Sequence, residues 1–229
     1  MIEYLKTALK TPISDEEHTR RVVAEMLREI ETEGENKVRH YAETLDGWTG
    51  DIVITPDDIE KAAAQVPQQV KEDIQFAHER VQRFAEAQLS SLSEFETELS
   101  PGLIAGQRLV PVQTAGCYIP GGRYAHIASA VMSVTTAKVA GVSNVIVCSP
   151  TRGVEGIHAS ILYAARLAGA DTILALGGVQ GVAALAFGLF PGHPADILVG
   201  PGNRFVAEAK RILYGRVGID LFDGPTEIA

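Results

Sequence analysis

Four glycine-rich turns carry the residue types in this chain that could bind a nucleotide. They follow short apolar runs in the second half of the sequence, at residues 116–122, 177–180, 200–203 and 224–227. A glycine turn between a strand and a helix lets the backbone approach a ligand, and the start of a helix offers N–H groups to an anion. The first three turns each lead into a helix-like stretch, so together they predict a site for a nucleotide or an anionic substrate.

Polar side chains at two of these turns have both a binding and a structural interpretation. Gly200 and Gly202 precede Asn203, where free N–H groups are expected to face a phosphate; alternatively, Asn203 is a plain N-cap. Gln180 heads an apolar helix and can hydrogen-bond a ribose or an amide, or simply cap the helix. The turn at residues 200–203 lacks the G-x-G-x-x-G spacing, so it does not identify a cofactor by itself.

The first turn adds an aromatic residue and two cationic side chains. Tyr118 could stack on a planar ring or donate its hydroxyl, or it could be a core residue. Arg123 and His126 are three residues apart, so a helix start there would place them on one face. Arginine suits carboxylate, phosphate or sulfonate; the alternative is a solvated helix start.

The surrounding pattern predicts the elements that position these residues. Residues 1–98 are charged and indicate helices, with a brief strand at residues 52–55. Residues 95–115 predict a hairpin whose return strand covers residues 107–112. Beyond it, strand and helix alternate, which predicts an α/β fold with a mostly parallel sheet, helices on both faces, and a ligand at the carboxyl ends of the strands. The expected strands are 115–119, 144–148, 172–176, 196–199 and 218–222, and the expected helices are 127–140, 156–168, 180–187 and 203–214.

Composition excludes several classes of partner. The chain has 229 residues and a net charge of −9, which argues against nucleic acid or an anionic membrane as a partner. Two cysteines are too few for a disulfide framework, and no metal-binding spacing of Cys or His occurs. No signal pattern or membrane-length apolar run is present, so the sequence predicts a soluble, cytoplasmic protein.

Taken together, the turns resemble those of the histidinol dehydrogenase family. The resemblance runs through residues 115–122, 175–180, 199–203 with 205–211, and 224–227, and it covers essentially the whole chain. It implies an incomplete Rossmann-like domain that binds NAD, with Tyr118, Gln180 and Asn203 as contacts. It also implies two NAD-dependent hydride transfers that convert a primary alcohol to a carboxylate through an aldehyde, in a zinc-dependent homodimer.

The family's zinc ligands and its Glu-His acid/base pair follow the fourth turn, so the resemblance implies that they lie beyond Ala229. No catalytic or metal residue is therefore expected in this chain, which is interpreted as an N-terminal fragment without turnover of its own. We expect residues 1–115 to belong to a first α/β domain, residues 116–223 to form the NAD-binding domain, and residues 224–229 to begin a return to the first domain.

The chain departs from the histidinol-using members at one position and resembles the sulfopropanediol 3-dehydrogenase branch of the family in three segments. Thr226 stands where histidinol-using members generally have a substrate-contacting serine, and the segments 121–129, 134–138 and 188–190 resemble that branch. The implied substrate is 2,3-dihydroxypropane-1-sulfonate, oxidised to 3-sulfolactate, with Arg123 and His126 as hypothetical sulfonate ligands. L-Histidinol is the alternative substrate, and a nucleotide-binding or sugar-phosphate-binding module without chemistry is the alternative class.

Overall fold

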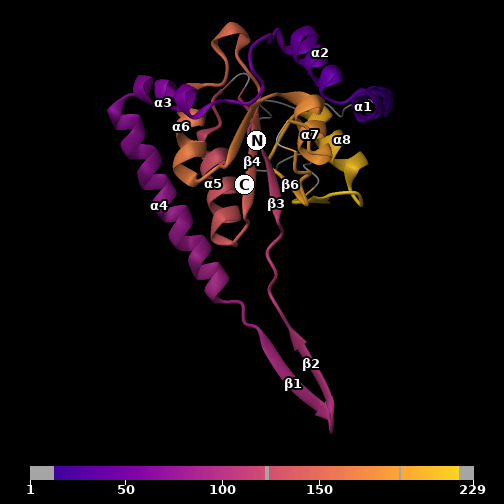
Figure 1. Cartoon of the computed structure of the whole chain (residues 1–229), viewed down its shortest axis with the longest axis vertical. Coiled ribbons are helices and arrows are strands. Elements are labelled where there is room, and N and C mark those ends of the chain that lie inside the picture. Colours follow the sequence, from indigo (N-terminus) through magenta and orange to yellow (C-terminus); the bar gives the residue numbers. More distant parts are fainter. Residues whose placement is uncertain (1–12, 122–123, 191, 222–229) are drawn as a thin grey trace, which may run out of the picture.

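The computed structural model describes residues 13–121, 124–190 and 192–221, and its centre is a five-stranded sheet (Figure 1). All neighbouring strands are parallel, in the order β5-β4-β3-β6-β7. The strands are β3 (Thr114–Tyr118), β4 (Asn144–Ser149), β5 (Thr172–Ala175), β6 (Ile197–Val199) and β7 (Gly218–Ile219). The predicted α/β fold is confirmed. Because β3 is central, the chain winds outward through β4 and β5, then crosses back to β6.

Helices cover both faces of this sheet. α5 and α6 pack on one face, where α4 and α3 contact them from outside; α7 and α8 pack on the other, where α1 and α2 lie (Figure 1). The helices of the described residues are α1 (Ile13–Glu33), α2 (Glu35–Asp46), α3 (Pro56–Gln65), α4 (Gln68–Ser90), α5 (Ile127–Val139), α6 (Ala159–Ala168), α7 (Gly178–Phe187) and α8 (Arg204–Leu213).

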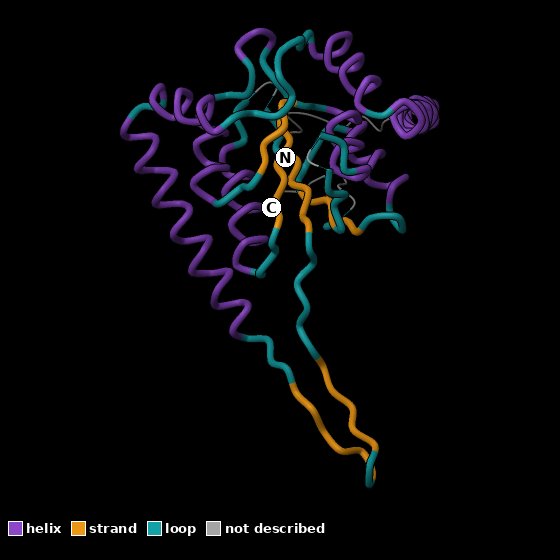
Figure 2. The backbone as a smooth tube through the Cα atoms, in the orientation of Figure 1, coloured by secondary structure: helices purple, strands orange, loops and turns teal. Residues whose placement is uncertain are grey.

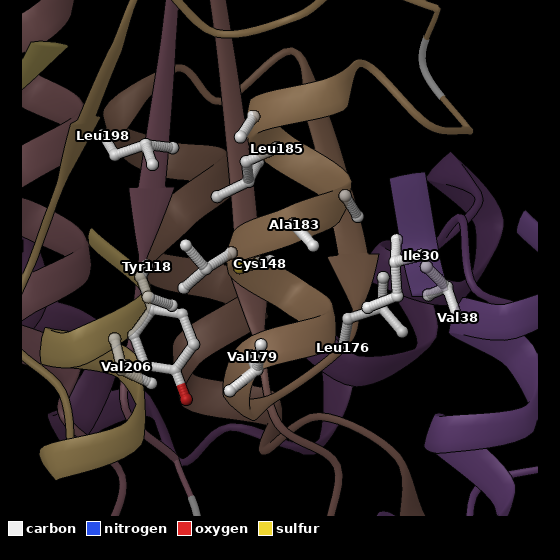
Figure 3. Close-up of a cluster of buried hydrophobic side chains, with 14 of the residues drawn as sticks. Ile30, Val38, Tyr118, Cys148, Leu176, Val179, Ala183, Leu185, Leu198 and Val206 are labelled. Carbon is white, nitrogen blue, oxygen red and sulfur yellow. The ribbon is translucent and has the colours of Figure 1, made fainter. Parts of the chain in front are cut away.

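Each sheet face has its own hydrophobic core, which explains why the strands are apolar without alternation. Neighbouring residues of one strand point to opposite faces. Cys117 therefore enters the core under α5 and α6, whereas Tyr118 and Cys148 enter the core under α7 (Figure 3). Both faces are buried, as expected of a parallel sheet between two helical layers.

A long arm leaves the body of the molecule between α4 and β3 (Figures 1 and 2). It ends in an antiparallel hairpin of β1 (Phe95–Ser100) and β2 (Leu103–Gln107). The hairpin is confirmed, but the predicted return strand at 107–112 is wrong, because β2 begins directly after the turn. Every residue of both strands is exposed, so no buried face imposed an apolar alternation that the sequence could reveal.

Other boundaries also shift from the predicted ones. The predicted strand at residues 52–55 is only an antiparallel bridge, in which Val53 pairs with Leu174 at the edge of β5. α6 starts at Ala159 rather than 156, because His158 caps it by accepting a hydrogen bond from the Ser160 N–H. α7 starts at Gly178 and β7 ends at Ile219.

None of the helices in the described ranges is long and apolar enough to cross a membrane.

Candidate cofactor site

The carboxyl ends of β3 and β6 meet at the point where the winding of the sheet reverses. Ligands of open α/β sheets bind in the crevice at such a point. Tyr118 ends β3, and Gly200 follows the last residue of β6. Gly200 has φ +113°, and a Cβ atom there would lie 2.1 Å from the Tyr118 carbonyl oxygen. Only glycine fits this contact, so the first and third predicted turns are brought together.

Tyr118 contributes a hydroxyl to this edge rather than an open ring. The side chain is 5% exposed and its ring lies in the core that contains Cys148 and Val179 (Figure 3). Its Oη accepts a hydrogen bond from the Gly178 N–H at 3.1 Å. Burial raises the pKa of the hydroxyl, so its proton stays in place. Because the ring is packed in the core, the core interpretation of Tyr118 is confirmed and the stacking interpretation does not fit, while donation by its hydroxyl to a ligand stays a prediction.

Gln180 lies in the first turn of α7 and contacts a residue far away in the sequence. It is 1% exposed, and its Nε2 donates to Asp46 Oδ2 at 2.8 Å. Asp46 is the last residue of α2 and is only partly buried. Burial raises the pKa of its carboxyl, while hydrogen bonds from Gln180 and the Gly177 backbone act in the opposite direction.

The turn between β5 and α7 is therefore held at both of its glycines. Asp46 Oδ2 lies against Gly177, and the Gly178 N–H donates to the Tyr118 hydroxyl. A Cβ at Gly177 would lie 2.6 Å from Pro150 Cβ, which follows β4. The ends of β3, β4 and β5 thus converge on this turn.

The turn after β6 is held by an ion pair. The Gly200 N–H donates to Asp220 Oδ2 at 2.8 Å, and the Gly200 carbonyl accepts from Lys210 Nζ at 3.0 Å. Lys210 is 2% exposed and also pairs with Asp220. A buried ammonium needs such partners, because an unpaired buried charge is strongly destabilising.

Asn203 is confirmed as the N-cap of α8. Its Oδ1 accepts hydrogen bonds from the N–H groups of Phe205 and Val206, at 2.9 and 3.1 Å. The residue is exposed, and its Nδ2 group takes no part in this cap. Gly202 packs closely here, since a Cβ would lie 2.3 Å from Val206 Cγ1.

These contacts correct the expectation that the turns offer free N–H groups to a phosphate. Side-chain oxygens already occupy the N–H groups of Gly178, Gly200, Phe205 and Val206. The sequence marked Tyr118 and Asn203 among these acceptors, but it did not reveal Asp220, nor Lys210, which donates to the Gly200 carbonyl, nor Asp46, which accepts from Gln180. Asp46 and Gln180 are 134 positions apart, and only the Asp-Gly pair that ends α2 marked the region at all.

The proposed substrate residues are only partly described. His126 is the exposed N-cap residue of α5 and makes no side-chain capping bond. Arg123 and Thr226 lie outside the described residues. The structure therefore leaves the substrate side of the site as a prediction.

Two further features at this edge suit a polar ligand with an apolar part. Ser149 Oγ and Thr151 Oγ1, which flank the end of β4, are buried and lack a hydrogen-bond partner within the described residues. An apolar hollow of about 560 Å³ lies between α5 and β6 and reaches Gly200, Pro201 and Asp220. Unpaired buried hydroxyls are costly, so this edge retains capacity for polar groups.

The described residues form no candidate metal site. Across residues 13–121, 124–190 and 192–221, no three His, Cys, Asp or Glu side chains gather in a way that could hold a metal ion. These described residues therefore do not fit a zinc ion.

Comparison with known proteins gives a consistent result along the whole chain. A family model described as "Histidinol dehydrogenase" matches residues 9–229. The crystal structure of histidinol dehydrogenase from Elizabethkingia anophelis is similar with a TM-score of 0.84 at 28% identity, covering 95% of this chain and 53% of that one.

Curated relatives divide by name. A "Histidinol dehydrogenase homolog" of Ruegeria pomeroyi is 58% identical over 226 residues, and the "Sulfopropanediol 3-dehydrogenase" of the same organism is 54% identical over 226; each alignment covers 99% of this chain and 52% of the relative. The "Histidinol dehydrogenase" of Methanococcus maripaludis is 42% identical over 207 residues, covering 90% of this chain and 48% of the relative. The chain spans about half the length of the relatives it matches.

Proposed function

Because the chain belongs to the histidinol dehydrogenase family, we propose that the whole protein is an NAD- and zinc-dependent dehydrogenase of a small polar primary alcohol. The alcohol is oxidised to an aldehyde, which takes up water and is oxidised to the carboxylate, and each of the two oxidations delivers one hydride to one NAD⁺. The favoured substrate is 2,3-dihydroxypropane-1-sulfonate, with 3-sulfolactate as product.

The observation that carries the substrate is the difference in similarity between named relatives. The chain is 54% identical to a sulfopropanediol 3-dehydrogenase across 99% of its length, but 42% identical to a histidinol dehydrogenase across 90%. Thr226 and the cationic pair Arg123 and His126 support the same choice, since a sulfonate is a permanent anion. L-Histidinol remains the second candidate, because the relative at 58% identity is named only as a histidinol dehydrogenase homolog.

The described residues fit NAD at the carboxyl edge of the sheet. After their contacts within the chain, three side chains keep hydrogen-bonding capacity: the Tyr118 hydroxyl and the Asn203 NH₂ group can donate, and the Gln180 amide oxygen, which has no hydrogen bond within the described residues, can accept. The absence of side chains at Gly200 and Gly202 lets the backbone of this turn pack closely against Tyr118 and Val206. When bound, NAD would supply the hydride acceptor, while these residues hold and orient it.

The proposal also covers the catalytic residues, the domains and the assembly of the whole protein. We place the zinc ligands and the acid/base residues beyond Ala229, and divide the chain at residues 115 and 223 into part of a first domain, the NAD-binding domain and a return segment. A cytoplasmic homodimer completes the proposal.

Substrate identity is tested by steady-state assays of the whole protein with both alcohols, following NADH absorbance. We expect a higher kcat/KM for 2,3-dihydroxypropane-1-sulfonate than for L-histidinol, and two NADH formed for each alcohol consumed. Arg123→Ala should raise KM for the sulfonate more than KM for L-histidinol. A higher kcat/KM for L-histidinol, or an unchanged KM for the sulfonate in Arg123→Ala, would overturn the choice of substrate.

The alternative class is tested with the 229-residue chain and with the whole protein. Under the proposal, calorimetry shows NAD binding to the whole protein, which turns over, whereas the chain alone does not form NADH. NAD binding by a whole protein that oxidises neither alcohol would favour a non-catalytic nucleotide-binding module.

A further inference from the structure

Resting on the proposed cofactor role of Gln180, we infer that Asp46 is a positioning residue that fixes which atom of Gln180 faces the cofactor. Asp46 takes the amide nitrogen, so the amide oxygen is left to accept a hydrogen-bond donor of NAD. Such a donor is either a ribose hydroxyl or the carboxamide NH₂ of the nicotinamide.

The chemistry of the two groups dictates this orientation. An ionised carboxylate only accepts hydrogen bonds, so the Gln180 amide must direct its NH₂ group at Asp46, as the 2.8 Å contact shows. Within the described parts of the chain, no hydrogen bond reaches Gln180 Oε1. The side chain is 1% exposed, so it cannot turn over freely in solvent.

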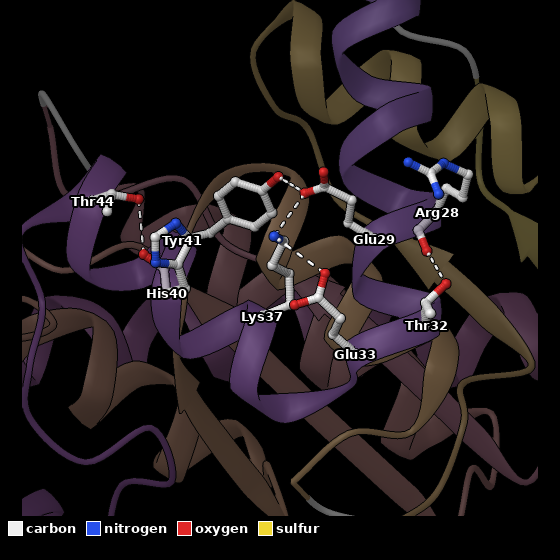
Figure 4. A network of polar contacts seen from close by, with 8 residues as sticks. All are labelled: Arg28, Glu29, Thr32, Glu33, Lys37, His40, Tyr41 and Thr44. Atoms are coloured by element: carbon white, nitrogen blue, oxygen red, sulfur yellow. Dashed lines mark hydrogen bonds and ion pairs between the residues drawn. The ribbon is translucent and has the colours of Figure 1, made fainter.

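Asp46 is placed by a separate set of contacts. It ends α2, which Gly47 terminates in the left-handed conformation, and α2 packs on α7. α2 is also held by α1, where Glu29 accepts hydrogen bonds from Tyr41 and Lys37 of α2 (Figure 4). This network fixes α2 against α1, and α1 itself contacts α7. The Asp46 carboxylate is therefore delivered to the start of α7 by tertiary packing.

Close approach of the backbone supports the same role. A Cβ at Gly177 would lie 3.4 Å from Asp46 Oδ2, and a Cβ at Gly178 would lie 3.0 Å from Gln180 Oε1. The absence of side chains at both glycines lets Asp46 and Gln180 lie against the turn. The two halves of the amide thus have different neighbours, a carboxylate on one side and the turn on the other.

The charge of Asp46 also selects the kind of ligand group. In the described residues it forms no ion pair, so its negative charge is not compensated locally. Like charges repel across a few ångströms, particularly where water is partly excluded. A phosphate is therefore disfavoured beside Gln180, and a hydroxyl or amide donor is favoured.

The first test is a double-mutant cycle in the whole protein, with NAD affinity measured by calorimetry. Asp46→Asn keeps the shape but no longer dictates the orientation of the amide, and we expect NAD to bind roughly tenfold more weakly. In a Gln180→Ala background the same substitution should have no further effect, because Asp46 acts through Gln180. Glu43→Gln, an exposed change on the same helix, is the matched control and should leave affinity unchanged.

The outcomes separate the alternatives. If Asp46→Asn weakens NAD equally in both backgrounds, or not at all, the positioning role is wrong. If the parent protein does not bind NAD, the proposed function itself fails.

A second test needs no substitution at Asp46. The parent protein is titrated with an NAD analogue whose carboxamide is replaced by an acetyl group, and with one that lacks a hydroxyl on the nicotinamide ribose. We expect one of the two to bind roughly tenfold more weakly to the parent but not to Gln180→Ala. Equal losses with and without Gln180, or no loss for either analogue, would overturn the acceptor role.

Discussion

The turns after β5 and β6 are built alike but differ in charge. In each, an aspartate from another segment lies against a glycine: Asp46 lies beside Gly177, and Asp220 accepts a hydrogen bond from the Gly200 N–H. Asp220 is neutralised by the buried ammonium of Lys210, whereas Asp46 forms no ion pair within the described residues. One turn is locked without net charge, and the other keeps a negative charge beside a glutamine.

The difference implies an orientation for a dinucleotide. Next to the neutralised turn, α8 begins at the exposed Asn203, and the positive end of a helix dipole favours an anion. Next to the charged turn, Asp46 favours donors such as hydroxyl or amide groups. In the proposed NAD complex, a donor-bearing end of the cofactor is therefore expected near Gln180, and the pyrophosphate is expected away from Asp46.

The largest effect should come from Gly200→Ala, which attacks the neutralised turn directly. The new methyl would overlap the Tyr118 carbonyl, at 2.1 Å, in a backbone conformation with φ +113°. We expect a loss of about 4 kcal/mol or more in the free energy of unfolding, measured by urea denaturation. Gly215→Ala is the control, with φ +99° and nothing within 4 Å of its Cβ, and should cost about 1–2 kcal/mol. Equal losses would mean that backbone conformation, not the strand contact, sets the requirement.

Lys210→Met tests the neutralisation itself. It leaves Asp220 and the Gly200 carbonyl without their buried partner, so we expect a loss of about 3 kcal/mol in the free energy of unfolding. Lys61→Met, which removes a pair with a 73% exposed lysine, should cost less than about 1 kcal/mol. Adding Asp220→Asn to Lys210→Met should recover part of the loss, and failure to do so would show that packing rather than charge determines the effect.

Local chemistry explains what the sequence could predict. Apolar strands ending in glycines indicate a parallel sheet, and an asparagine after such a turn is a typical N-cap. The sequence could therefore predict β6, the turn after it and the N-cap role of Asn203. The hairpin turn was also found, but not the return strand, because β2 is exposed on both faces and carries no period.

The contacts that seal the turns could not be predicted in the same way. The sequence marked Gln180 but not Asp46, because packing of α2 on α7 joins residues from opposite ends of the chain. Lys210 lies in an amphipathic helix, where a lysine is expected to be solvated. The sequence around Asp220 gives no sign of its partner. Pairs that exist only through tertiary packing leave no spacing signal.

Tyr118→Phe should cause a smaller loss in the free energy of unfolding. It affects the turn after β5, where Asp46 keeps its charge. It removes the acceptor of the Gly178 N–H and should cost about 1–2 kcal/mol of unfolding free energy. Tyr124→Phe, at a residue that is 74% exposed, should change stability by less than about 0.5 kcal/mol. NAD affinity, measured by calorimetry, should fall only in the first variant; an unchanged affinity would remove Tyr118 from the proposed cofactor contacts.

The smallest effect is a difference in pH dependence that follows from the uncompensated charge of Asp46. Burial raises the pKa of Asp46 above its ordinary value of 3.8, so the native state binds this proton more tightly than the unfolded state. Its contribution to stability is present below 3.8 and is lost as pH rises through the raised pKa. The opposite holds at Asp58, where hydrogen bonds from Thr55 and Lys61 lower the pKa: its contribution is present above 3.8 and is lost as pH falls through the lowered value.

Unfolding free energies measured from acidic to neutral pH, for the parent and for each Asp→Asn variant, make this comparison. The difference between parent and Asp46→Asn should decrease as pH rises, whereas the difference between parent and Asp58→Asn should increase. Because each difference isolates one carboxyl, the remaining acids cancel to first order. If both differences change in the same direction as pH rises, Asp46 is compensated after all, and the two turns do not differ in charge.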